Sequence, residues 1–209
     1  VTVAIETEVG RLFGVRILED DVHRNALPGD IVEIMITVEN SGNGMDDITL
    51  DAAFVNWSGD IDFNGTGMVP AEKRAGAVTL LVPYDAAFGE TDLVSLTASS
   101  SGNASDPLEV RISVGALHSL TVVHDEVRTF AKPGEMLSFA IPVFNTGNAP
   151  DELELVLKNR SGWEAVLFTE GASVLTGESW MLHLNISVPV DSLEGDTEQI
   201  NVSCIYAGD

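Results

Sequence analysis

Positive charge is scarce in this chain. Its 209 residues include ten Lys plus Arg against 33 Asp plus Glu, so the net charge is −23 and the pI is about 4.2. Because phosphate groups are bound by clustered Lys and Arg, this balance argues against nucleic acids and anionic membrane surfaces as partners. The excess of acid, with seven Arg and three Lys, is typical of salt-adapted proteins such as those of archaea, since dissolved salt screens self-repulsion.

Cysteine and long apolar runs are also scarce. The single cysteine, Cys204, excludes an internal disulfide. No apolar run approaches the roughly 20 residues that span a membrane, so we expect no direct membrane insertion. The sequence begins at Val1 without a Met or a signal peptide, which favours a mature product or an excised piece.

Sequence motifs for catalysis are missing. The chain has no His-Glu-x-x-His metal motif, no Gly-x-Ser-x-Gly nucleophile elbow and no Gly-rich phosphate loop. Its four histidines lack the spacing of metal ligands, and carboxylates are too numerous for any pair to be informative. We therefore expect no enzyme activity. Apolar residues at 44% nevertheless provide enough material for folded cores, which excludes a disordered acidic tail.

What the chain does contain is an internal repeat. Ala26–Asp30 (ALPGD) is matched 105 residues later by Ala131–Glu135 (AKPGE), and Asn40–Asn43 (NSGN) is matched at the same spacing by NTGN. After one inserted residue the spacing becomes 106, and Trp57 is then matched by Trp163. Turn residues and apolar residues recur together, so the chain contains two copies of one domain of about 105 residues.

Each copy shows the alternation of short strands with one buried face. In the first copy, Ile34, Ile36 and Val38 alternate with polar or exposed positions, and the second copy repeats this pattern. Short strands between turn signals, without helical periodicity, predict an all-β fold of two tandem immunoglobulin-like antiparallel sandwiches. The Pro-Gly pairs fit a turn, and the Asn-Ser-Gly-Asn and Asn-Thr-Gly-Asn runs fit a tight turn with positive φ.

The second copy carries motifs that resemble a known family. Pro133–Glu135, the run Asn145–Asp151 (NTGNAPD), Gly162-Trp163 and Val188-Pro189 resemble CARDB-like immunoglobulin-type domains. The resemblance implies a β-sandwich of the kind found in bacterial and archaeal surface proteins and in accessory modules of secreted glycosidases. The first copy departs from the pattern, with Asn43-Gly44-Met45 in place of the Asn-Ala-Pro step. One such scaffold hosts many functions, so the resemblance bears on the fold.

The two ends of the chain are out of phase with the repeat. Residues 108–114 are the expected last strand of the first copy, and the repeat aligns residues 1–9 with this region. The chain stops before the second copy supplies the same strand. We expect an N-terminal donor-like strand at 1–9, a first sandwich at 10–115 and a second at 116–209 that lacks its last strand. The apolar positions of the N-terminal strand are Val1, Val3, Ile5 and Val9.

Two interpretations of these ends remain open. In the first, the chain is a piece of a longer tandem array that forms a surface stalk. In the second, residues 1–9 of one subunit insert into the second sandwich of another copy, and the head-to-tail contact generates an open filament. Both describe an extracellular structural protein of the cell surface. An adhesion or carbohydrate-binding accessory module cut from a larger secreted protein is the alternative function.

Asn-x-Ser/Thr sequons are more frequent than chance predicts. Six occur, whereas random placement of 11 Asn and 30 Ser plus Thr predicts about 1.6. They begin at Asn56, Asn64, Asn103, Asn159, Asn185 and Asn201. These positions fall at expected turns or on outward-facing strand positions, where a glycan can project into solvent. The sequence therefore predicts N-glycans as covalent partners, which implies export.

Other candidate sites are weak. Calcium is the one possible cofactor, and its candidate ligands Asp20, Asp21, Asp125 and Glu126 follow the first strand of each copy without matching a dedicated calcium loop. A solvated acidic surface is the simpler interpretation. The phase of Cys204 places it in the core as a small apolar residue. Trp180 shares the inward phase of its neighbours, which disfavours an aromatic platform for sugars.

Overall fold

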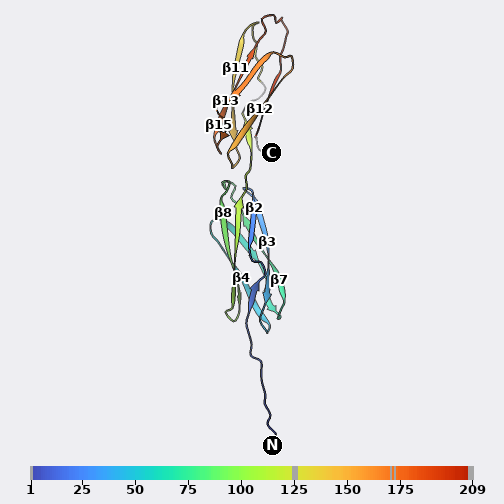
Figure 1. The fold of residues 1–209 in the computed structure, drawn as a ribbon, viewed down its shortest axis with the longest axis vertical. Helices are drawn as coiled ribbons and strands as arrows, with labels where there is room; N and C mark the ends of the chain where they lie inside the picture. Colours follow the sequence, from blue (N-terminus) through green and yellow to red (C-terminus); the bar gives the residue numbers. More distant parts are fainter. Residues whose placement is uncertain (1, 124–126, 170, 172, 207–209) are drawn as a thin grey trace. The chain divides into compact units, whose positions relative to one another are not determined.

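The computed structural model describes residues 2–123, 127–169, 171 and 173–206. Within these residues the chain forms sixteen strands and no helix, and so no helix that could cross a membrane. It divides into two compact units, Val1–Gly115 and Ala116–Asp209. Each unit contains two sheets (Figure 1), so the predicted all-β fold of tandem immunoglobulin-like sandwiches is confirmed.

The first sandwich pairs a four-stranded with a five-stranded sheet. The first sheet has the order β1 (Val15–Ile17), β3 (Ile31–Asn40), β7 (Lys73–Leu81) and β5 (Ser58–Asp62). The second has the order β2 (Val22–Ala26), β9 (Ser105–Val114), β8 (Thr91–Ser100), β4 (Asp46–Phe54) and β6 (Gly65–Met68). Neighbours are antiparallel except β2 and β9, which are parallel. This parallel pair arises because the chain continues from β1 to β2 without reversing and changes sheets on the way.

The core of the first sandwich follows the predicted alternation. Ile34, Ile36 and Val38 on β3 are buried, whereas Met35 between them is exposed and Thr37 is half-buried. The facing sheet contributes fully buried side chains at alternate positions of β8 and β9. The largest of these buried groups are Ile34, Ile36, Met68, Leu80, Leu96 and Ile112. Burial of such side chains is the main stabilising contribution to a sandwich of this size.

The second sandwich repeats most of this arrangement. One sheet has the order β10 (Leu120–Val122), β11 (Met136–Asn145), β15 (Ser179–Ser187) and β13 (Glu164–Thr169). The other has the order β14 (Ser173–Val174), β12 (Asp151–Asn159) and β16 (Ile200–Tyr206). β10 is the counterpart of β1, and β11 to β16 are the counterparts of β3 to β8. Among the described residues of this unit, no strand corresponds to β2 or to β9.

The repeated Asn motif joins the two sheets of each sandwich. The side chain of Asn40, at the end of β3, is fully buried, and its Nδ2 donates hydrogen bonds to the carbonyl oxygens of Gly44 (3.0 Å) and Met68 (2.8 Å). Asn145 makes the same contacts with Ala149 (2.8 Å) and Val174 (3.2 Å). Because Met68 and Val174 lie in the facing sheets, each Asn connects both layers of its sandwich.

The glycines of this motif do not have the positive φ that the sequence suggests. Positive φ occurs instead at the Pro-Gly turns, with +83° at Gly29 and +79° at Gly134. Glycine is required at positions 42 and 147 because the backbone of another segment passes close to each Cα atom. An added Cβ would lie 2.6 Å from the carbonyl oxygen of Leu12 at Gly42, and 2.1 Å from that of Leu117 at Gly147. These glycines therefore let the segment that enters each sandwich pass directly over the turn.

Candidate assembly site: the open edge of the second sandwich

β16 is an edge strand, unlike its counterpart in the first sandwich. β8 lies between β4 and β9, and both neighbours are antiparallel to it. β16 pairs with β12, and within the described residues no strand lies on its other side. An edge strand presents unpaired N–H and C=O groups to any extended chain that can align with it. We name the unpaired side of β16 and the apolar side chains behind it the open edge.

The core behind the open edge is incompletely covered. In the first sandwich Val94, Leu96 and Ala98 on β8 are fully buried, and the inward side chains of β9 cover them. Their counterparts on β16, Ile200, Val202 and Cys204, are only half-buried. On β12, Leu153 and Leu155 are also half-buried, whereas their counterparts Ile48 and Leu50 on β4 are buried. The difference is what removal of one strand from a closed sandwich would produce.

One end of β16 is fixed by the carboxylate of Glu198. This carboxylate accepts hydrogen bonds from the backbone N–H groups of Arg160 (2.8 Å), Ser161 (2.7 Å) and Trp163 (2.9 Å). Burial raises the pKa of Glu198, but these backbone hydrogen bonds outweigh it and hold the pKa below the ordinary 4.5. Asp92 makes the corresponding hydrogen bond with the N–H of Trp57 (3.0 Å). The segment leading into β16 is therefore held as it is in the closed sandwich.

The other end of β16 is fixed by an aromatic contact. The ring of Tyr206 stacks on the ring of His118, with 5.0 Å between centroids and 15° between planes. His118 Nδ1 is in turn hydrogen-bonded to the carboxylate of Asp151, which is buried. Contacts within the second sandwich therefore hold both ends of β16.

The N-terminal segment has the features of a strand but no partner. Residues 2–9 form no strand and are exposed, with Val3 76%, Ile5 87% and Val9 85% accessible. Figure 1 shows them as an extended trace that leaves the first sandwich. The strand expected at residues 1–9 is not formed within the chain, because an extended segment requires a neighbour for its backbone groups. Val1 lies outside the described residues.

The entry points of the two sandwiches are equivalent in structure. The Leu12 N–H donates to Asn43 Oδ1 (2.7 Å), and the Leu117 N–H donates to Asn148 Oδ1 (2.6 Å). Both contacts precede the first strand of a sandwich. The segment before Leu12 therefore has the same place in the sequence as β9, which precedes Leu117. At this spacing residues 3–9 align with residues 108–114 of β9.

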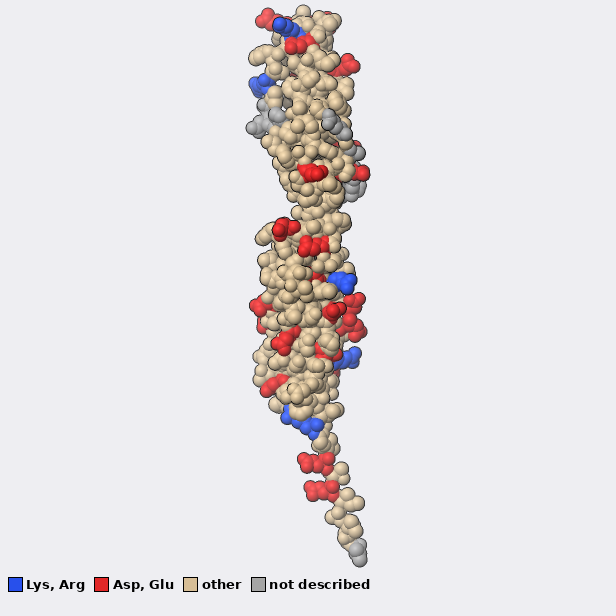
Figure 2. Space-filling model, turned by 90° about the vertical axis from the view of Figure 1, so that its left-hand side faces the viewer, with Lys and Arg blue, Asp and Glu red and all other residues tan. Residues whose placement is uncertain are grey.

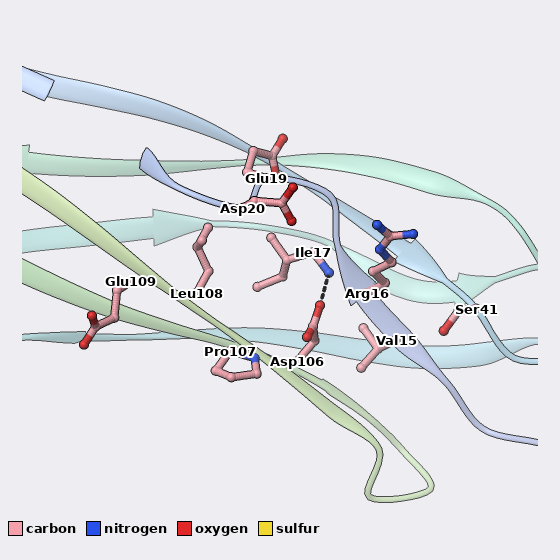
Figure 3. A pocket seen from close by; sticks show the side chains of 10 residues that line it. All are labelled: Val15, Arg16, Ile17, Glu19, Asp20, Ser41, Asp106, Pro107, Leu108 and Glu109. Carbon is pink, nitrogen blue, oxygen red and sulfur yellow. Dashed lines mark hydrogen bonds between the residues drawn. The ribbon is translucent and has the colours of Figure 1, made fainter. Parts of the chain in front are cut away.

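The first sandwich has a surface hollow of about 580 Å³ beside β1 (Figure 3). It lies next to the first half of β9, which β2 does not cover because β2 pairs only with Val110–Val114. Its carboxylates bind the backbone, since Asp106 accepts the Ile17 N–H (2.7 Å) and Glu19 accepts the Thr37 N–H (2.9 Å). The hollow marks the place where the chain changes sheets between β1 and β2.

The described part of the chain shows no cluster of side chains that would support calcium binding. Asp20 and Asp21 are exposed, and Asp20 lines the hollow beside β1. Asp125 and Glu126 lie outside the described residues. Among the residues that are described, no group of three or more His, Cys, Asp or Glu side chains could hold a metal ion. Calcium binding stays a prediction from the sequence.

Most of the sequon asparagines lie at accessible positions. Five are exposed and Asn185, in the middle of β15, is half-buried; the exposed ones are Asn56, Asn64, Asn103, Asn159 and Asn201. Asn103 occupies the turn between β8 and β9 with a φ of +67°. Asn56 Nδ2 donates to Asp92 (3.0 Å), and Asn159 Nδ2 donates to the carbonyl of Trp163 (2.8 Å). Each amide nitrogen has a second hydrogen, so these bonds leave one position for substitution.

The remaining side chains of interest have structural positions. Trp57 is buried, and Trp163 and Trp180 are half-buried. Cys204 is a free cysteine, half-buried on the inward side of β16, and burial raises the pKa of its thiol. Figure 2 shows Asp and Glu scattered over both units on the face drawn, with few Lys or Arg among them. This distribution agrees with a chain whose excess acid is solvated rather than gathered in one site.

The fold and the open edge define a tandem immunoglobulin-like β-sandwich protein. No family model and no curated protein sequence matches the chain, so membership of the CARDB-like family stays a prediction. Solved structures match at low identity. A Porphyromonas gingivalis protein of unknown function is 16% identical, with a TM-score of 0.36, over 83% of each chain.

Two other similar structures come from secreted or surface systems. A chain of the chaperone–tip adhesion subunit complex of Acinetobacter baumannii Csu pili is 8% identical, with a TM-score of 0.41, over 91% of this chain and 99% of that one. A secreted serine protease of Vibrio cholerae is 11% identical, with a TM-score of 0.39, over 93% of this chain. The chain spans 51% of that protease. At these identities the similarities concern the fold alone.

Proposed function

We propose that the protein is a non-catalytic, extracellular subunit of a surface filament, stalk or coat, and that it assembles head-to-tail by strand donation. Residues 1–9 of one subunit pair with the open edge of the next. One observation supports this most directly: the first sandwich is closed by β9, whereas the second exposes β16 and a half-buried core at the same place. The chain contains an exposed segment with the spacing of the absent strand.

The alternation of the N-terminal segment matches that of β9. On β9 the buried positions are Leu108, Val110, Ile112 and Val114. Their counterparts are Val3, Ile5, Thr7 and Val9, with Ala4, Glu6 and Glu8 on the other face. Because Leu96 lies opposite Leu108 and Val94 opposite Val110, Val3 should lie opposite Val202 and Ile5 opposite Ile200. Full burial of an aliphatic side chain of this size stabilises by about 1.5–3 kcal/mol.

Such a contact can join many copies head-to-tail. Each subunit has one donor segment and one open edge on different surfaces, so the contact is heterologous and joins further copies without closing on itself unless the geometry forms a ring. The step Val9-Gly10 would also repeat the step Val114-Gly115 that links the two sandwiches within one chain. The proposed filament is therefore one tandem array, connected covalently within subunits and by strand pairing between them.

Disulfide trapping tests this register. A chain with Val3→Cys and Val202→Cys, and with Cys204→Ala to remove the native thiol, places two cysteines directly opposite across the proposed joint. Opposite side chains of an antiparallel pair have Cβ atoms about 4.5–5.5 Å apart, close to disulfide geometry. We expect oxidation to give a ladder of covalent multimers on a non-reducing gel. The Ala4→Cys, Val202→Cys pair is the matched control, because Ala4 faces the other way, and it should give no ladder.

An apolar contact at the same joint is tested by Ile5→Asp. Residues 2–9 lie outside both cores, so the substitution leaves the sandwiches folded. We expect self-association, followed by light scattering and negative-stain microscopy, to weaken at least tenfold, and Ala4→Asp to leave it unchanged. Equal ladders from both cysteine pairs, or a monomer in every variant, would contradict strand donation. The chain would then be a piece of a longer protein whose own residues close the second sandwich, as in a surface stalk or an adhesion or carbohydrate-binding accessory module.

We also propose that the exposed sequons carry N-glycans. Five of the six asparagines are exposed, and Asn201 lies on the outward side of β16 between half-buried neighbours. Glycopeptide mass spectrometry of protein from its native source should find substituted Asn56, Asn64, Asn103, Asn159 and Asn201. Asn25 is exposed without a sequon and serves as the internal control. Unmodified asparagine at every sequon would contradict the proposal.

A further inference from the structure

The second sandwich has a further segment, before β11, that forms no strand although its counterpart in the first sandwich does. In the first sandwich, β2 pairs with β9 alone and lies at the edge of its sheet. The counterpart of β2 is Val127–Ala131, 105 residues later. These five residues form no strand and are exposed, with Val127 55% and Phe130 101% accessible. Val22, the counterpart of Val127, is 4% exposed.

We infer that the donated strand orders Val127–Ala131 of the acceptor into a parallel strand on its outer edge. This inference rests on the proposed strand donation. β2 has β9 as its hydrogen-bonding neighbour, and the described residues of the second sandwich form no corresponding strand, so the donor would take that place. The donor would then be paired along both edges, with β16 on one side and Val127–Ala131 on the other. Binding would thus be coupled to local folding of the acceptor.

The register of the parallel pair gives a specific charge contact. In the first sandwich Val22 lies opposite Val110 and His23 opposite Arg111. By the repeat, Val127 should lie opposite Ile5, and Arg128 opposite Glu6 of the donor. Opposite charges at facing positions of neighbouring strands are favourable. Arg128 is one of only ten Lys and Arg in a chain of net charge −23, and a second, Lys132, directly follows the segment that would lie beside Glu6 and Glu8.

Burial of apolar side chains would also favour a strand at Val127–Ala131. Val127 and Ala131 have the spacing of Val22 and Ala26, which are buried against the core of the first sandwich. A strand at Val127–Ala131 would therefore also cover part of the core behind the open edge. The segment contributes to the joint from the acceptor side, so the joint would be stronger than donation onto β16 alone.

The inference is tested by adding a synthetic peptide of residues 1–12 to the full chain carrying Ile5→Asp. This substitution prevents the chain's own N-terminal segment from acting as the donor. We expect the peptide to slow amide hydrogen exchange at β16 and also at 127–131, and to protect Cys204 from alkylation. Arg128→Glu should weaken peptide binding about fivefold. A peptide carrying Glu6→Arg should bind this variant better than the native peptide does, and bind the parent less well. Arg24→Glu, the same change on β2 of the first sandwich, is the control and should not alter binding.

The outcomes separate the two proposals. Protection of β16 and Cys204 without protection of 127–131, together with an unchanged affinity in Arg128→Glu, would overturn the additional strand and leave strand donation intact. Absence of peptide binding, with β16 exchange and Cys204 alkylation unchanged, would overturn both. Protection of both segments with rescue by the charge exchange supports the complete joint.

Discussion

Replacing Asn40 by alanine is expected to destabilise the first sandwich by about 3 kcal/mol, because it leaves buried polar groups without partners. The carbonyls of Gly44 and Met68 lose their donor, and the Gly42 N–H loses its acceptor at 2.9 Å. Asn145→Ala should destabilise the second sandwich for the same reason. Asn40→Asp should be at least as damaging, since a carboxylate would face two carbonyl oxygens.

Urea denaturation followed by tryptophan fluorescence can assign the effect to one unit. The first sandwich contains Trp57, and the second contains Trp163 and Trp180. Asn25→Ala is the matched control, because Asn25 is exposed on β2 and the side-chain change is identical. A midpoint shift in Asn40→Ala no greater than that in Asn25→Ala would show that the buried amide does not hold the two sheets together.

Leu96→Ala should lower the unfolding free energy of the first sandwich by about 3 kcal/mol, within the usual range for a large-to-small change in a core. Leu96 is 0% exposed on β8 and lies opposite Leu108 on β9. Its counterpart Val202 is half-buried behind the open edge. Val202→Ala should therefore cost about 1 kcal/mol or less in the free chain.

Adding the peptide of residues 1–12 further distinguishes Leu96→Ala from Val202→Ala. Saturating peptide should increase the cost of Val202→Ala, because the site becomes closed, and should leave the cost of Leu96→Ala unchanged. Leu81→Ala, at a position 40% exposed on β7, controls for a leucine outside the core. Equal losses from Leu96→Ala and Val202→Ala in the free chain would mean that the two cores are equally closed.

The alternating core could be predicted from sequence because it depends on local pattern. The positions of Ile34, Ile36 and Val38 follow directly from a period of two and one buried face. The repeat added a second independent reading of the same pattern. The repeat also aligned residues 3–9 with residues 108–114, and in the structure the contacts of Leu12 and Leu117 recur at the same spacing.

Features that depend on distant partners could not be predicted in the same way. The parallel pairing of β2 with β9 depends on where the chain changes sheets, and alternation contains no signal for strand direction. The requirement for glycine at Gly147 comes from the carbonyl of Leu117, a contact between segments that local turn rules do not include. The contact of His118 with Asp151 and Tyr206 likewise joins the segment before β10 to the ends of β12 and β16, which only the folded sandwich brings together.

The parallel pair of β2 and β9 has a mechanical consequence. The chain enters the first sandwich through β1 and β2 and leaves it through β9, so tension along the polypeptide pulls β2 and β9 from opposite ends. Their five residue pairs, from Val22 with Val110 to Ala26 with Val114, are then loaded together in shear instead of being peeled apart one by one. A joint between subunits that acquired the same parallel strand would resist traction by the same geometry.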